Sequence, residues 1–137
     1  MALGWIAARA AEERGSSIVE GLLALGLLLL VFGIGAEAML FAQARTIAIA
    51  AAQEGARSAA LGGESAGLAS AREVLAAGGG LADGLSASIE ERGASVTALV
   101  AGSPPALFHS GVLLPAIRAA ATVPQERYTA AEFATSP

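Results

Sequence analysis

The stretch that decides the fold runs from Gly21 to Ala36 and reads GLLALGLLLLVFGIGA, sixteen residues without a charge. Glu37 interrupts the apolar character, which then resumes over residues 38–42. From Gly21 to Ala44, 24 residues at ~1.5 Å rise give a helix of roughly 36 Å, which is enough to cross ~30 Å of hydrocarbon. A core helix of a soluble domain does not need large apolar residues on every side. The sequence therefore predicts a membrane span at about residues 21–44.

The orientation of this span follows from the residues before it. Arg9 and Arg14 precede the span, and the positive-inside rule therefore favours a cytoplasmic N-terminus, with most of the chain outside the cytoplasm. A removable signal peptide is the alternative, because Ala36-Glu37-Ala38 has the small-x-small form of a signal peptidase site. The apolar character resumes at Met39-Leu40-Phe41, which a secreted mature start does not require. We therefore favour a membrane anchor.

The predicted helix extends well beyond the span. No Pro lies between Ser16 and Leu61, and the Gly residues in this stretch are tolerated better in membrane helices than in water. We expect a helix over residues 16–61 that ends at Gly62-Gly63. Its outer half carries alanine at every fourth position, and these alanines share a face: Ala44, Ala48, Ala52, Ala56 and Ala60. Small residues allow close packing, but Ala is also the best helix former, and the pattern leaves both interpretations open.

The remaining residues, 62–137, predict a small α+β head. Apolar spacing indicates a second short helix over residues 64–77, and Gly78-Gly79-Gly80 is expected to be a flexible connector. Period-two alternation predicts a strand over Leu85–Glu90, followed by a turn at Glu91-Arg92-Gly93 and a second strand over Ser95–Ala101. A third strand is predicted over Ile117–Val123, bounded by Pro115 and Pro124. We expect a three-stranded antiparallel sheet and a loose tail after Tyr128.

Composition excludes several partners. Net charge is −4, and the eight basic residues are all Arg and scattered, so no basic face exists for nucleic acid. The chain has no Cys, hence no disulfide and no thiolate metal site. Hydrophobic residues make up 55% but aromatics only 4%, which suits close-packed helices better than a bulky core. Membrane lipid is the partner that composition favours.

No set of residues predicts catalysis. Gly63-Glu64-Ser65-Ala66-Gly67 matches the G-x-S-x-G elbow, but a helix precedes it and the chain is too short for the fold that uses this motif. His109 is the only His and Asp83 the only Asp, so a triad would need both. A lone His without Cys or a second His is no metal site. We expect neither an enzyme nor a bound cofactor or metal.

Three stretches carry a family resemblance. Arg14-Gly15-Ser16-Ser17-Ile18-Val19-Glu20 has the form of a type IV prepilin processing site, and Phe32–Glu37 and the Ala-rich Glu-Gly-Ala-Arg stretch Ala51–Ala60 follow it. Together they resemble the TadE family of tight-adherence (Flp-type) pilus systems over Arg14–Leu61. The likeness near the end, at Pro124-Gln125-Glu126, is fainter.

The resemblance implies a cytoplasmic leader over residues 1–15 and cleavage by a prepilin peptidase after Gly15. The new amine of Ser16, in the same or a neighbouring subunit, would then pair with Glu20, a carboxylate that is costly at a membrane edge unless paired. Glu37 corresponds to a second acid in the family's pattern. One departure is Gly21, where processed pilins of this system usually carry an aromatic residue.

The function that the resemblance implies is structural. The chain would be a pilin-like minor pilin or pseudopilin, held in the bacterial cytoplasmic membrane until it joins a pilus or a related secretion assembly. Its partners would be other pilin-like subunits and the assembly machinery. The alternative is a permanently membrane-anchored extracytoplasmic binding module that never enters a filament.

Overall fold

The computed structural model describes residues 3–104, 106 and 115–125, with side chains from residue 17 onward. His109, Glu126 and the tail after Tyr128 therefore lie outside the described residues. The chain forms two compact units, Met1–Ala38 and Met39–Pro137, and helix α1 (Leu3–Gly62) contributes to both. We call them the N-terminal and the C-terminal unit.

Helix α1 is longer at its start than residues 16–61, because the preceding residues also adopt helix from Leu3. Residues 3–15 read LGWIAARAAEERG, which is rich in the strong helix formers Ala, Leu, Arg and Glu and contains no Pro. At its end the helix stops at Gly62. Gly63 has φ 82°, a left-handed value that favours glycine, and its N–H donates to the Ala59 carbonyl oxygen at 2.9 Å.

The described side chains of the N-terminal unit are mostly apolar and lie on every side of the helix. Its large hydrophobic side chains between Ile18 and Ile34 are 52–76% exposed. Within the described residues, one helical stretch, Ser17–Gly62, is long and apolar enough to cross a membrane, and none of its most apolar window is buried. Leucine side chains on all sides of a helix cannot all pack against one core. Such a surface is suited to the hydrocarbon of a membrane.

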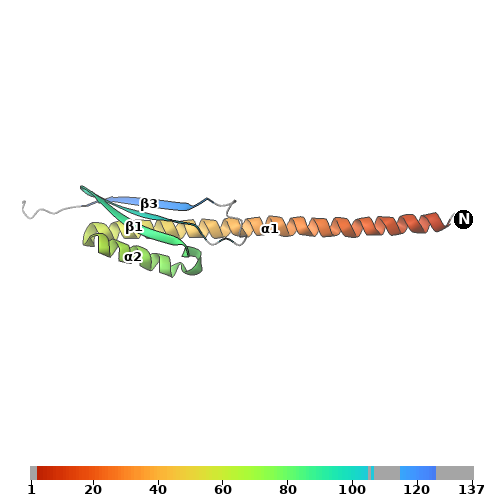
Figure 1. Ribbon diagram of the computed structural model, residues 1–137, viewed down its shortest axis with the longest axis horizontal. Coiled ribbons are helices and arrows are strands. Elements are labelled where there is room, and N and C mark those ends of the chain that lie inside the picture. The colour runs from red at the N-terminus through yellow and green to blue at the C-terminus, as the bar shows by residue number, and fades with distance from the viewer. Residues whose placement is uncertain (1–2, 105, 107–114, 126–137) are drawn as a thin grey trace, which may run out of the picture. The chain divides into compact units, whose positions relative to one another are not determined.

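The C-terminal unit is a two-layer α+β arrangement, as expected. Helix α2 (Glu64–Ala77) has the bounds predicted from the sequence, and a short 3₁₀ helix η1 (Gly79–Ala82) stands where we expected a flexible connector. Three antiparallel strands follow in the order β1-β2-β3. Their bounds are β1 (Leu85–Arg92), β2 (Ser95–Gly102) and β3 (Ile117–Pro124). Figure 1 shows the strands side by side, with α2 and the last part of α1 along one face.

The register places most of the apolar residues of the three strands on one face, and Leu99 is the large apolar side chain on the other. Ala98 lies opposite Ile89 in β1 and Ala121 in β3, and Val100 lies opposite Ala87 and Ala119. The other face is largely polar, with the Thr97 and Thr122 hydroxyls 2.9 Å apart across β2 and β3. The alternation that predicted the strands therefore separates a core face from a solvent face.

The alanine ridge of α1 is part of this core. Ala44, Ala48, Ala52 and Ala56 are 0–1% exposed, while Ala60 is only half-buried. They share buried clusters with Val100, Ile117 and Ile89 of the sheet and with Leu75 of α2. The ridge therefore serves close packing, and its partner is the chain's own sheet and second helix.

The crossing of α1 and α2 depends on two glycines. A Cβ added to Gly67 would lie 2.6 Å from the Gly55 carbonyl oxygen and would overlap the Ala59 side chain. A Cβ added to Gly55 would lie 3.0 Å from the Ala71 Cβ and 3.5 Å from the Ala98 Cβ in β2. The two helices and the central strand thus approach one another at Gly55, where only a residue without a side chain leaves enough space.

Candidate functional site

The predicted processing site lies within the helix. Gly15 and Ser16 both belong to α1, whose backbone is helical across their peptide bond. Proteolysis acts on locally opened chain, so a peptidase would require this turn of helix to open. Gly15 lowers the cost of opening, because Gly is less favourable than Ala in a helix by about 1 kcal/mol.

Glu20 is the first acid of α1 whose side chain is described, and it is exposed. Its neighbours Val19, Leu22 and Leu23 are exposed apolar side chains, so the carboxylate lies at the edge of the apolar surface. Among the residues whose side chains are described, none forms an ion pair with Glu20. A carboxylate in this position is tolerated at the headgroup level and becomes costly deeper in hydrocarbon.

Glu37 differs from Glu20 in its surroundings. It is 5% exposed and is the buried charged residue of the described part of the chain. Glu20 and Glu37 are seventeen positions apart, which corresponds to about 25 Å of helix, so the two acids bracket the uncharged run. Sequence reasoning selected Glu37 but gave no sign of its burial, because burial depends on contacts that a local pattern does not contain.

The motif Gly63–Gly67 is placed by the structure at the start of α2. Ser65 is exposed in the first turn and lines a shallow hollow with Glu64, Leu68 and Arg72. The preceding element is α1, and a nucleophile elbow requires a strand at that position. Gly67 has a packing role instead, at the helix crossing. In the described residues, no group of three or more His, Cys, Asp or Glu is arranged to hold a metal ion.

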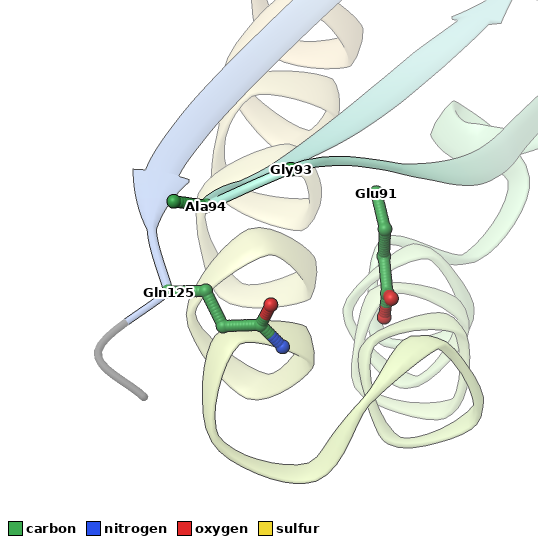
Figure 2. A pocket seen from close by; sticks show the side chains of 4 residues that line it. All are labelled: Glu91, Gly93, Ala94 and Gln125. Atoms are coloured by element: carbon green, nitrogen blue, oxygen red, sulfur yellow. The ribbon is translucent and has the colours of Figure 1, made fainter. Parts of the chain in front are cut away.

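A second hollow lies at the turn between β1 and β2. It is lined by Glu91, Gly93, Ala94 and Gln125, and the Gln125 backbone N–H donates to the Ala94 carbonyl oxygen at 2.7 Å. Figure 2 shows the Glu91 and Gln125 side chains pointing from the strands towards the layer of helices. The Gln125 Oε1 atom is buried and has no hydrogen-bond partner within the described part of the chain. One carboxylate and one amide can hold a polar group by hydrogen bonds.

A third hollow joins the start of β3 to α1. It is lined by Phe41 and Arg45 from α1 and by residues 115–118, which include Arg118. Ile117 and Ala44 belong to the same buried cluster, and this packing places both arginines around one hollow, with Arg118 on the face of β3 opposite to the buried Ile117. The sequence showed these arginines only as scattered charges, because their proximity depends on a contact between residues more than seventy positions apart.

The apolar part of α1 with its two acids and the three shallow hollows are the candidate sites of the described structure. Comparisons with known proteins give no match: no family model matches the chain, and neither a curated protein nor a solved structure matches it.

Proposed function

We propose that this chain is a TadE-like minor pilin or pseudopilin of a tight-adherence pilus or a related secretion assembly. It would be anchored in the bacterial cytoplasmic membrane by residues 21–44, with residues 1–15 in the cytoplasm and the α+β part outside. The main support for the proposal is that the two parts of α1 have different surfaces. Its first part exposes large apolar side chains on all sides, and its last part is the alanine-lined spine of the C-terminal unit.

The exposed apolar part suits two successive environments. In the membrane it contacts lipid, and in a filament the same side chains would pack against neighbouring copies of the helix. Glu20 supplies register, because its carboxylate would pair with the Ser16 amine of an adjacent subunit once the leader is removed. The role is structural, and the partners would be other pilin-like subunits, the assembly machinery and a prepilin peptidase.

N-terminal sequencing of protein from native membranes tests the processing step. Cleavage after Gly15 gives a chain that starts at Ser16 and has 122 residues (137 − 15). Gly15→Leu should leave the full-length form, because a side chain at that position would obstruct the peptidase. An intact Met1 in the wild type would remove the processing step from the proposal.

Piliation assays test the role of Glu20. The Glu20→Ala and Glu20→Gln variants should still insert into the membrane. An unpaired carboxylate raises the free energy of helix insertion by ~2.5 kcal/mol or more, so its removal does not hinder insertion. Both should fail to join a filament or to support piliation. Gly21→Ala is the matched control, because a Cβ there meets no described atom within 4 Å. Normal assembly of both Glu20 variants would contradict the proposed register contact.

A second candidate function is a permanently anchored extracytoplasmic binding module. The buried Gln125 Oε1 beside the Glu91 hollow favours it, because this atom has no hydrogen-bond partner among the described residues and is suited to a polar ligand. An intact Met1 together with normal piliation in a strain lacking the protein would support this function over the first.

A further inference from the structure

The hollow at the turn between β1 and β2 lies at one end of the sheet, where the core-facing positions become polar. Glu91 follows the buried Ile89 by two positions in β1, and Gln125 follows the half-buried Val123 by two positions at the end of β3. Side chains two positions apart share a face of a sheet. Figure 2 accordingly shows the Glu91 and Gln125 side chains pointing towards the layer of helices, and both line the same hollow.

This hollow offers hydrogen-bond acceptors and a negative charge. Glu91 is the charged residue among its described lining residues, and none of the described side chains forms an ion pair with it. The Gln125 Oε1 atom has no donor among the described residues, and the amide can turn about its last bond to present this oxygen to the hollow. A carboxylate and an amide oxygen are together suited to a cation with several N–H donors, such as a guanidinium group.

Arg118 lies near the other end of the sheet and on its other face. It is opposite Ala101 in β2, whereas Glu91 is opposite Val96, whose partner in β3 is Val123. Arg118 and Val123 are five positions apart, which corresponds to about 17 Å of strand. Arg118 is exposed and forms no ion pair with a described acid. Its guanidinium group is therefore out of reach of the hollow in its own chain and is available to another copy.

Complementary groups at the two ends of one sheet suit a head-to-tail contact. Figure 1 shows the strands running lengthwise beside the last part of α1, so the two ends of the sheet face in opposite directions along that part of the helix. A contact between unlike surfaces adds each new copy in the same direction, and it gives an open filament unless the rotation closes a ring. Every basic residue of the chain is Arg, so each copy supplies guanidinium groups.

We infer that a second copy of this chain places its Arg118 guanidinium group in the hollow at Glu91 and Gln125, so that the C-terminal units associate head to tail. The inference rests on the filament role of the proposed function and adds a polar contact outside the membrane. The polar group that the hollow takes would then come from the chain itself. This contact is separate from the one proposed for Glu20, which lies in the N-terminal unit.

Disulfide cross-linking of the full chain in native membranes tests this contact, because the chain has no Cys of its own. One variant carries Ala94→Cys, in the lining of the hollow, and the other carries Ala120→Cys, two positions after Arg118 on the same face of β3. Both positions are exposed. When the two variants are co-expressed, mild oxidation should give a product with the mass of two copies. Each variant expressed alone should give none, because a head-to-tail contact joins unlike surfaces.

Charge variants of the co-expressed pair test the role of the guanidinium group. Arg118→Gln and Glu91→Gln, each placed in both chains, should lower the yield of the product about fivefold, the upper range for an exposed ion pair. Glu91→Arg combined with Arg118→Glu in the same chains should restore the yield. Glu90→Gln is the matched control and should leave the yield unchanged, because Glu90 lies on the outer face of β1 and is 2.8 Å from Arg92.

Three results would overturn the inference: no two-copy product, equal products from each variant alone, or a yield that does not respond to Arg118→Gln and Glu91→Gln. N-terminal sequencing and piliation assays on the same cells separate it from the proposed function. If the chain starts at Ser16 and piliation requires Glu20 but no product forms, only the contact between C-terminal units is wrong. If the product forms as expected while Met1 is intact and piliation does not need the protein, the contact stands and the proposed function is wrong.

Discussion

Replacing Gly67 by Ala tests the closest contact of the C-terminal unit. The added methyl group would overlap the Ala59 side chain and lie 2.6 Å from the Gly55 carbonyl oxygen and 3.1 Å from the Ala59 Cα. Two of these atoms belong to the backbone of α1, so relief requires α2 to move as a whole. Helix propensity acts in the opposite direction, because Ala is favoured over Gly by about 1 kcal/mol in a helix interior.

The magnitude follows from these two opposing effects. Overpacking a tight site costs about 1–3 kcal/mol, and contact with backbone places Gly67→Ala at the upper end of that range. After subtraction of the propensity gain, the free energy of unfolding should fall by about 2 kcal/mol. Exchange of the β2 amides through opening of the unit should then accelerate about 30-fold. Hydrogen exchange of the full chain in micelles, read by mass spectrometry on peptides from Ser95–Gly102, measures this change.

Ala69→Gly on the exposed side of α2 calibrates the measurement, because it changes helix propensity alone. It should lower the free energy of unfolding by about 1 kcal/mol. Unchanged or slower exchange in Gly67→Ala would refute the reasoning. It would mean that the helices do not cross at the distance that the structure gives.

Three further predictions concern the core and the topology. Val100→Ala removes part of a fully buried side chain and should lower the free energy of unfolding by about 2 kcal/mol. Leu99→Ala, on the outer face of β2, should lower it by less than about 1 kcal/mol. The same hydrogen-exchange measurement reads both changes. A reporter active only outside the cytoplasm, fused after Pro137, should be active, and activity of a cytoplasmic reporter alone would contradict the orientation. The protein should resist carbonate extraction, and a soluble product that begins at Met39 would instead show cleavage by signal peptidase after Ala38.

Local patterns predicted most of the elements. The bounds of α2 follow from Gly63 before it and Gly78 after it, and the strands follow from apolar residues at every second position. The structure begins α1 at Leu3, whereas the sequence prediction began the helix at Ser16. That prediction followed the processing motif at Gly15 and did not use the helix propensity of residues 3–15. Propensity acts on the backbone whatever the later fate of the segment.

Features that depend on long-range contacts could not be predicted in the same way. The alanine spacing identified a face of α1, but its partner became evident only from the packing of Ala48 and Ala52 in one cluster with Val100 and Leu75. The burial of Glu37 and the position of Arg45 and Arg118 around one hollow likewise have no local signature. Such contacts arise from strand register and from the angle between helices, which many sequences with the same local pattern share.

The small side chains of the core determine how the chain tolerates change. Among the described residues, Val96 and Val100 are the largest fully buried side chains, and most of the other buried positions are Ala. Replacing a buried alanine by glycine removes only one methyl group. A larger side chain at such a position, or at Gly67, overpacks the core and should lower the stability more. Stability here depends on close approach of backbones more than on the area that each residue buries.

This packing also limits how the proposed filament could form. The ridge that would let a second helix approach α1 closely is covered by the chain's own sheet along Ala44–Ala56. The opposite face of the same stretch exposes Thr46, Ile49, Gln53 and Arg57, a mixed surface with one large apolar side chain. Contacts between neighbouring copies that depend on apolar packing must therefore come from the part of α1 before Ala38. That part contains Glu20, so register and apolar packing would be supplied by the same segment.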